Sequence, residues 1–390
     1  MSSQKHILML LDNPFTNDRR VQREIETLSS NGFQITLLCV KKNGLPDKEL
    51  HPNFELRRVF TDAIFDIKQQ KLHAELAHSI ISEYTFDVIH CHDQTMLNIG
   101  ARIKKIKPTL TLVYDSHELF HQWPVNIPVK NFSLFVKSFI VRYWQIFREK
   151  KNGRYIDHLI TVNNSLATIL CSYFRLETQQ VTVLRNIPEL KPLSHRDKIL
   201  RQKFGIADET FLLVFIGANI YRKTLNLEQV ISEVNNRENI ALVFICSQNV
   251  HCQAIIDYCK EKACKNVFFH DIIAPNDIQN YLSGCDAGLV PTWNKNDLSY
   301  WLALDNKLFE YLHAKIPILA TQQPEYMNIV DNYNVGICVN PDMKNAYLEG
   351  VYNISKNKKL YSDNMDKAIS ELNWDAESTK ITNLYKTFLN

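Results

Sequence analysis

The chain has 390 residues, 45% of them apolar, and a formal net charge of +3, because 45 Lys and Arg face 42 Asp and Glu. This length suggests two domains, and the apolar content suffices for packed cores, which excludes a largely disordered chain. A net charge this close to zero gives no global signal for nucleic acid. Only ten glycines occur, and none has the spacing of G-x-G-x-x-G or of the Walker motif G-x-x-x-x-G-K-[ST]. Any nucleotide is therefore bound without either glycine-rich loop.

The compartment can be predicted from the N-terminus and the cysteines. The first apolar run, residues 7–11, is shorter than the about 7–15 residues of a secretory signal. No run reaches the about 18–20 apolar residues of a membrane-spanning helix. The nine cysteines are odd in number and several lie in apolar runs, which is typical of reduced thiols in the cytoplasm. His251, Cys252, Cys259 and Cys264 have no common zinc spacing, so we expect no metal.

Apolar runs of strand length recur along the chain with helix-length segments between them. The first series is 5–11, 33–40, 54–60, 86–92, 110–115, 157–163 and 180–185, and the second is 211–217, 240–246, 266–271, 285–291, 316–321 and 335–339. Continuous rather than alternating runs are typical of parallel strands buried on both faces. The sequence therefore predicts an α/β fold of two Rossmann-like, doubly wound domains with a cleft between them. A segment with prolines and charges, 186–205, separates the two series.

The segment 132–151, FSLFVKSFIVRYWQIFREKK, interleaves aromatic, aliphatic and basic residues. This pattern is typical of an amphipathic helix. We favour the interpretation that its apolar stripe packs on the sheet of its own domain. The alternative is peripheral membrane contact through 130–154, because basic and aromatic residues suit an anionic surface.

The C-terminal stretch NWDAESTKITNLYKTFLN predicts a last helix with one buried face. Trp374, Ile381, Leu384, Tyr385 and Phe388 recur at helical spacing. No strand follows this helix, so the pattern alone allows it to dock on either domain.

Ligands of open parallel sheets bind beyond the carboxyl ends of the strands, so polar residues there are candidates. The first strand is followed by DNPFTNDRR, which includes Thr16 and Asn17, and either Asn17 or Asp18 suits a helix N-cap. The fourth strand is followed by HCHD and the fifth by YDSHE, which bring His92 and His117 to one edge of the sheet. A buried histidine is often structural, but two at neighbouring strand ends indicate a functional site.

In the second half, cations stand near expected helix starts. Arg222 and Lys223 follow the strand 211–217, and Lys307 lies in the first turn of a helix capped by Asp305 or Asn306. Cations near helix N-termini oppose the helix dipole, and a shared anionic ligand would remove the conflict. Free backbone N–H groups with Arg and Lys make a phosphate site that needs no glycine-rich loop. Glu310, one turn further on, suits a ribose diol or, alternatively, only the helix dipole.

At these residues the chain resembles the retaining GT-B glycosyltransferases, in the large family that includes bacterial sucrose-, mannose- and polysaccharide-related transferases. The matching segments are NPFTNDRRVQREIETLSSNGFQITLLC, FDVIHCHD, TLVYDSHELF, DHLITVNNSLATIL, VTVLRNIP, FLLVFIGANIYR, CDAGLVPTW, DNKLFEYLHAKIPILAT and WDAESTKITNLYKTFL. The resemblance implies an acceptor-side domain, 1–190, completed by the last helix, 373–390, and a nucleotide-sugar-binding domain, 191–372.

The resemblance also implies roles for individual residues. His117 corresponds to the family histidine near the transferred sugar and its phosphate. Arg222 and Lys223 fall where the family places its pyrophosphate-binding cations, with Lys307 as a further cation and Asn306 beside it. Glu310 corresponds to the second glutamate of the E-x7-E motif, the one that similar enzymes use on the ribose.

Two departures from the family pattern stand out. The first motif glutamate is replaced by Leu302, which puts sugar recognition in doubt. The family's glycine-rich first loop is replaced by FTND, so Thr16, Asn17 and His92 are the candidates for contact with acceptor or phosphate.

We therefore predict transfer of a sugar from a nucleoside-diphosphate sugar to an acceptor hydroxyl, with retention, in polysaccharide or glycolipid synthesis. The partners would be the nucleotide sugar and a glycan or lipid-linked acceptor, with no nucleic acid, no metal and no cofactor. The protein would lie in the cytoplasm, at the inner face of the membrane if 130–154 contacts it. Two alternatives stay open because a fold does not fix a reaction: a catalytically decayed partner subunit and a nucleotide-sugar epimerase.

Overall fold

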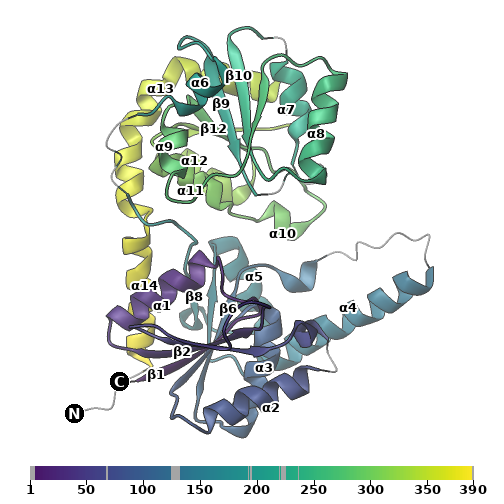
Figure 1. The fold of residues 1–390 in the computed structure, drawn as a ribbon, viewed down its shortest axis with the longest axis vertical. Coiled ribbons are helices and arrows are strands. Elements are labelled where there is room, and N and C mark those ends of the chain that lie inside the picture. Colours follow the sequence, from purple (N-terminus) through teal and green to yellow (C-terminus); the bar gives the residue numbers. More distant parts are fainter. Residues whose placement is uncertain are drawn as a thin grey trace. The chain divides into compact units, whose positions relative to one another are not determined.

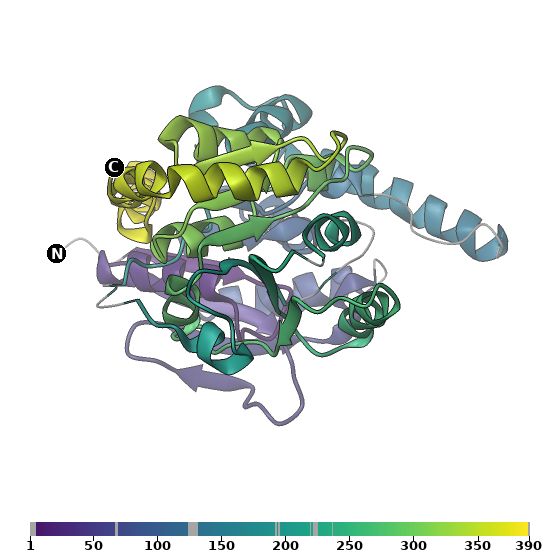
Figure 2. The ribbon, with the colours of Figure 1, turned by 90° about the horizontal axis from the view of Figure 1, so that it is seen from above.

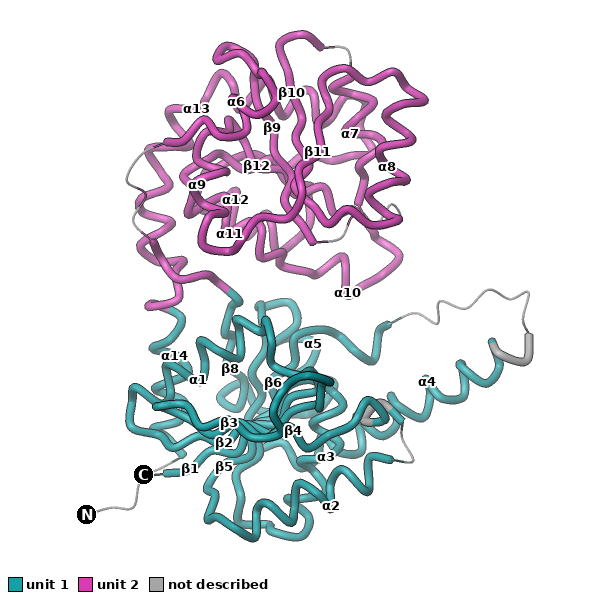
Figure 3. The backbone as a smooth tube through the Cα atoms, in the orientation of Figure 1, with its two compact units in different colours: residues 1–186, 377–390 teal, residues 187–376 magenta. Residues whose placement is uncertain are grey.

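The computed structural model describes residues 5–66, 69–123, 132–191, 193, 196–218, 220, 225–235 and 237–388, without the side chains of 64–65 and 132–134. The chain divides into two compact units, which are coloured in Figure 3. Unit 1 comprises residues 1–186 and 377–390, and unit 2 comprises residues 187–376. The boundaries expected from the resemblance, 190/191 and 372/373, lie close to these.

Unit 1 is built on an eight-stranded sheet of order β3-β4-β2-β1-β5-β6-β7-β8. Its strands are β1 (His6–Leu10), β2 (Gln34–Val40), β3 (Lys48–Leu50), β4 (Glu55–Phe60), β5 (Val88–His92), β6 (Thr111–Ser116), β7 (His158–Thr161) and β8 (Val181–Val183). All neighbours are parallel except β3, which pairs antiparallel with β4. The seven predicted strands of this half are confirmed, and the short edge strand β3 was not predicted.

Helices connect these strands as a doubly wound fold requires (Figure 1). They are α1 (Arg19–Ser30), α2 (Gln70–Ile81), α3 (Asp93–Ile106), α4 (Phe132–Gly153) and α5 (Asn164–Phe174), with the 3-10 turns η1 (Asp62–Phe65), η2 (Phe120–Gln122) and η3 (Thr178–Gln180).

The last helix, α14 (Trp374–Thr387), belongs to unit 1 from Glu377 onward. Its apolar side chains are buried, as the spacing predicts. The Glu377 carboxylate accepts hydrogen bonds from the backbone N–H of Arg185 (2.9 Å) and from its guanidinium (3.2 Å). The Tyr385 hydroxyl lies 2.7 Å from Nδ1 of His90, within hydrogen-bonding distance. The helix therefore docks on the N-terminal domain, unit 1.

The amphipathic helix predicted over 132–151 is α4, but the favoured packing of its stripe is wrong. Only the C-terminal part of α4 packs on unit 1, where Arg148 and Glu149 are buried. Seven large apolar side chains between Val136 and Phe147 stay exposed. The stripe faces away from the sheet because the polar side of the helix carries the contacts to unit 1.

Unit 2 has a six-stranded parallel sheet of order β11-β10-β9-β12-β13-β14. Its strands are β9 (Phe211–Ile216), β10 (Ile240–Ile245), β11 (Val267–His270), β12 (Ala287–Val290), β13 (Ile318–Thr321) and β14 (Gly336–Val339). Its helices are α6 (Ile199–Phe204), α7 (Leu227–Val234), α8 (Val250–Glu261), α9 (Ile278–Ser283), α10 (Leu298–Trp301), α11 (Asn306–His313), α12 (Pro324–Tyr333) and α13 (Ala346–Glu371). All six predicted strands of this half are confirmed.

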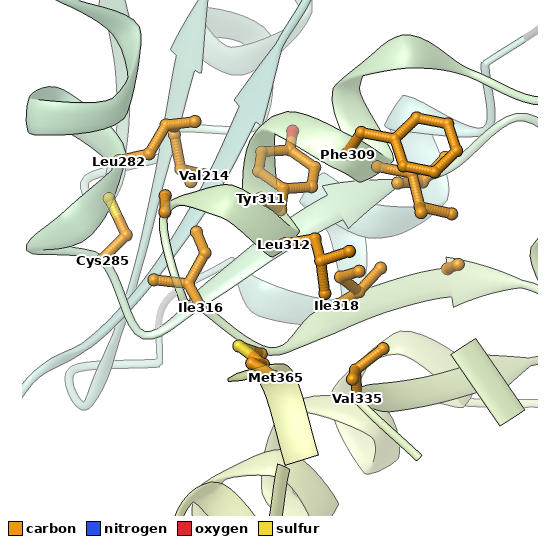
Figure 4. Close-up of a cluster of buried hydrophobic side chains, with 14 of the residues drawn as sticks. Val214, Leu282, Cys285, Phe309, Tyr311, Leu312, Ile316, Ile318, Val335 and Met365 are labelled. Atoms are coloured by element: carbon orange, nitrogen blue, oxygen red, sulfur yellow. The ribbon is translucent and has the colours of Figure 1, made fainter. Parts of the chain in front are cut away.

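Helix α11 is fixed to the sheet by its apolar face. Phe309, Tyr311 and Leu312 are buried, and Figure 4 shows them within the hydrophobic cluster of unit 2. A Cβ at Gly288 of β12 would lie 2.1 Å from the Tyr311 ring, so only glycine permits this approach. The Tyr311 hydroxyl accepts from the backbone N–H of Ile216 (3.0 Å), on the neighbouring strand β9. The rotation of α11 is thereby set, and with it the direction of its polar face.

None of the helices in the described part of the chain is long and apolar enough to cross a membrane.

Candidate functional site

His117 is held by carboxylates at the strand ends of unit 1. Its Nδ1 lies 3.2 Å from Oδ2 of Asp93, and its backbone N–H donates to the other oxygen of Asp93 (3.2 Å). Its Nε2 lies 3.3 Å from Oδ2 of Asp115. Asp93 directly follows β5 and has φ of 64°, an uncommon conformation for a residue other than glycine. Each of the two ring nitrogens of His117 therefore lies beside a carboxylate.

These carboxylates decide the charge of His117. Burial would lower the pKa of His117, but the negative charges of Asp93 and Asp115 outweigh burial and raise the pKa well above its usual value. The ring is then an imidazolium at neutral pH, and 22% of its side chain is exposed. A histidine that two carboxylates hold in the charged form is unsuited to general-base work and suited to electrostatic contact with an anion.

Asp115 is the centre of a buried ion-pair network. Burial would raise the pKa of Asp115, but the charges of Arg20 and His117 hold it well below its usual value. Arg20 donates from Nη2 to Oδ1 of Asp115 (3.0 Å) and from Nη1 to the carbonyl oxygen of Leu184 (2.9 Å). The same guanidinium lies 3.1 Å from Glu24, one turn further along α1. The network thus ties α1 to β6 and to the end of β8.

Two buried histidines complete the network. His90 and His92 stack at a ring separation of 4.3 Å, and the His92 ring lies 5.8 Å from that of His117. His92 Nδ1 is 3.5 Å from Asp115. Burial and the neighbouring His92 lower the pKa of His90 to about 4, so its ring is neutral at pH 7 and able to hydrogen-bond with Tyr385. The predicted candidates His92 and His117 are thus brought together at one sheet edge, but His92 is buried.

Glu24, His90, His92 and Asp115 are the residues of the described chain that could hold a metal, since ligand-type atoms of all four lie within 4.8 Å of one another. The Arg20 guanidinium forms ion pairs with the carboxylates of Glu24 and Asp115. It therefore already supplies the positive charge that a metal ion would bring. We interpret this cluster as an ion-pair network.

The loop after β1 is fixed from its base. Asp18 is the N-cap of α1 and accepts from the backbone N–H of Val21 (3.1 Å) and from the side chain of Asn13 (2.9 Å). Thr16 and Asn17 are exposed at the tip of the loop. Of the two predicted caps, Asp18 takes the role, which leaves the Asn17 side chain at the surface.

In unit 2, Lys307 lies in the first turn of α11, as expected. Its Nζ donates to Oδ2 of Asp305 (2.7 Å) and lies 5.4 Å from the centre of the Phe215 ring. Asp305 precedes the helix without capping it and also accepts from the hydroxyls of Thr292 and Tyr326 (both 2.9 Å). Burial would raise the pKa of Asp305, but the charge of Lys307 outweighs burial and lowers it.

Asp305 therefore offsets part of the conflict between Lys307 and the helix dipole. The side chain of Lys307 is 15% exposed. It lies in the first turn of an eight-residue helix, whose side-chain cap bond is absent. Backbone N–H groups point out of a helix at this end. A charge of this kind at a helix start can accept an anionic group.

The other candidates of unit 2 are distributed as follows. Asn306 is exposed at the start of α11, and Glu310 is half-buried one turn later. Leu302, where the resemblance expects a glutamate, is a buried apolar side chain after α10. Arg222 and Lys223 lie outside the residues that the structure describes.

The sequence did not single out Arg20 and Glu24. Both are buried. One signal was available: Glu24 stands between Val21 and Ile25, within the apolar face of α1. An acid at such a position indicates a buried partner.

Each half of the chain matches a family of known proteins. The family Glycosyltransferase Family 4 matches residues 18–187, and the family Glycosyl transferases group 1 matches residues 210–357. An uncharacterized glycosyltransferase of Methanocaldococcus jannaschii is 23% identical over 388 residues, 93% of this chain and 91% of the relative.

Solved structures share the fold. Sucrose-phosphate synthase from Thermosynechococcus elongatus has a TM-score of 0.78 at 14% identity, with 99% of each chain covered. Anabaena HepE in complex with UDP has a TM-score of 0.71 at 13% identity, covering 98% of this chain and 99% of its own. The same protein in complex with UDP-glucose has a TM-score of 0.69 at 14% identity, with the same coverage.

Proposed function

This chain belongs to the group 1 glycosyltransferases of the GT-B fold, and we propose that it transfers a sugar from a nucleoside-diphosphate sugar to an acceptor hydroxyl with retention at the anomeric carbon. The observation that carries the proposal is that both halves match glycosyltransferase families over residues 18–187 and 210–357. The similar HepE structures with UDP and UDP-glucose support a nucleotide-sugar donor.

In this proposal unit 2 binds the diphosphate. Lys307 and the N–H groups at the start of α11 stabilise the charge that develops as the diphosphate departs, together with Arg222 and Lys223. Glu310 accepts hydrogen bonds from the ribose, beside Asn306. Protein cations supply the charge that a divalent metal supplies elsewhere, so the reaction would need neither metal nor cofactor.

His117 orients the sugar and its phosphate in the same proposal. Asp93 and Asp115 fix its imidazolium in place, so that the positive charge is present before the acceptor binds. The departing phosphate rather than this histidine takes the acceptor proton. Thr16 and Asn17, exposed at the tip of the first loop, contact the acceptor or a phosphate.

We place the acceptor in polysaccharide or glycolipid synthesis, as a glycan or a lipid-linked sugar. The nine cysteines are free thiols, which favours the reducing cytoplasm.

The test has two steps. A thermal-shift screen with UDP, GDP, ADP and dTDP should raise the melting temperature with one base above the others, since a ligand bound to the folded state stabilises it. The corresponding nucleotide sugar is then incubated without acceptor, and NMR follows the slow hydrolysis that water supports. Free sugar released first as the donor's own anomer supports retention, and the opposite anomer contradicts it. Conversion of the sugar on intact donor would indicate an epimerase, and no shift with any nucleotide would indicate a decayed partner subunit.

A further inference from the structure

Helix α4 carries a continuous apolar stripe that nothing in the described part of unit 1 covers. Its members are between 38% and 69% exposed, and they are Val136, Phe139, Ile140, Val141, Tyr143, Trp144 and Phe147. Most recur at intervals of three and four residues and so lie on one side of the helix. Figure 1 and Figure 2 both show the N-terminal end of α4 extending beyond the rest of unit 1.

The opposite side of α4 is fixed to unit 1 by polar contacts. Glu149 is fully buried and accepts from the side-chain amide of Gln94 (3.2 Å) and from the hydroxyl of Tyr114 (3.4 Å). Asn152 donates to Asn98 of α3 (2.7 Å). Because these contacts set the rotation of the helix, the exposed stripe is a property of the folded unit.

The exposed lysines of α4 are positively charged, whereas the acidic residue of this helix is buried. Lys137, Lys150, Lys151 and the following Arg154 are exposed, and Glu149, the one acid in 132–153, is buried. Lys151 lies 5.9 Å from the centre of the Phe147 ring, so the basic cluster adjoins the stripe.

We propose that this face of α4 docks on an anionic lipid surface. The apolar side chains would enter the boundary between headgroups and acyl chains, while the lysines contact the lipid phosphates. Tyr143 and Trp144 suit this boundary because each has an apolar ring and a polar group. A second copy of the chain is a poorer occupant, since two such faces would bring like charges together.

This inference goes beyond the transfer reaction by naming the surface at which the protein works. It rests on the proposed function only for the identity of the acceptor, a sugar carried on a lipid. Its test needs no nucleotide sugar, so a failure of lipid binding and a failure of transfer are distinguishable.

The experiment is co-sedimentation of the full chain with vesicles of phosphatidylcholine, alone or mixed with phosphatidylglycerol. We expect binding to the mixed vesicles that weakens as salt is added. Lys150→Glu with Lys151→Glu should lower the partition coefficient at least about thirtyfold, since two attractions of about 1 kcal/mol each are lost. Ile140→Asp should lower it about tenfold. The matched controls lie on α8 of unit 2 and directly after it. Lys260→Glu with Lys262→Glu, and Val250→Asp, all at exposed positions, should bind like the unaltered chain.

Three results would overturn the proposal. The first is equal sedimentation with and without phosphatidylglycerol vesicles at low salt. The second is binding that the α4 variants reduce no more than the α8 controls do. The third is a concentration-dependent dimer, seen by analytical ultracentrifugation without lipid, that Ile140→Asp dissociates.

Discussion

The charged residues at the strand ends of unit 1 and those at the start of α11 in unit 2 are arranged in opposite ways. In unit 1, Arg20, Glu24 and Asp115 are buried and bonded to one another. In unit 2, Lys307 has one carboxylate partner and keeps part of its side chain exposed. A buried network holds structure in place and is costly to break, whereas a partly exposed cation can exchange its partner for a ligand. The two groups should therefore respond differently to loss of a charge.

The largest effect is expected from Asp115→Asn. It leaves the Arg20 and His117 cations in a buried site without their shared carboxylate, and such a loss costs about 3–5 kcal/mol of unfolding free energy. Urea unfolding followed by hydrogen exchange, read on peptides of unit 1, measures it. The comparison variant is Asp305→Asn in unit 2, where partial exposure reduces the cost to about 1–2 kcal/mol. Equal losses in the two variants would contradict the distinction between the two sites.

The next effect concerns ligand binding. Lys307→Ala should weaken the binding of the preferred nucleoside diphosphate by about 2 kcal/mol, because a charge-assisted hydrogen bond to phosphate is lost. Calorimetric titration measures the affinity. Lys295→Ala is the matched control, since Lys295 is also bonded to an aspartate of unit 2 (Asp342, 2.6 Å). If both variants bind equally well, the start of α11 is not the diphosphate site.

The strands could be predicted because a strand buried on both faces of a parallel sheet is a continuous apolar run. The exception is β3, whose three residues Lys48–Leu50 include two charges and pair only at the sheet edge. Such a strand is formed by its neighbour β4 and has no pattern of its own. The direction of the α4 stripe was also beyond the sequence, because an amphipathic pattern shows that one face is apolar and not what covers it.

The candidate site could be predicted only in part. His117 follows from the rule that polar groups gather where parallel strands end. Lys307 follows from its place in the first turn of a helix, where a cation opposes the helix dipole. Their partners did not follow from either rule, because Arg20 reaches Asp115 across 95 positions of sequence. Asp305 or Asn306 was expected as the helix cap; Asp305 takes the N-cap position, but its side chain bonds to Lys307 instead of to the helix backbone.

Glu24 is expected to hold a proton in the folded chain, and the pH dependence of unfolding tests this. Burial and the neighbouring Asp115 raise the pKa of Glu24 from 4.5 to about 7. A raised carboxyl pKa means that the folded state binds the proton more tightly than the unfolded state. The contribution of Glu24 to the free energy of unfolding is then greatest below pH of about 4.5 and falls as pH rises toward 7, by up to about 1.4 kcal/mol per pH unit.

Glu24→Gln should remove that slope from unit 1, because the amide does not titrate. Urea unfolding at several pH values between about 4.5 and about 7 measures the difference between the variant and the unaltered chain. Glu26→Gln, an exposed position on the same helix, should keep the slope. A slope that Glu24→Gln leaves unchanged would mean that Glu24 is ionised throughout. The three positions Arg20, Glu24 and Asp115 would then carry a net negative charge beside the His117 imidazolium, which Asp93 also contacts.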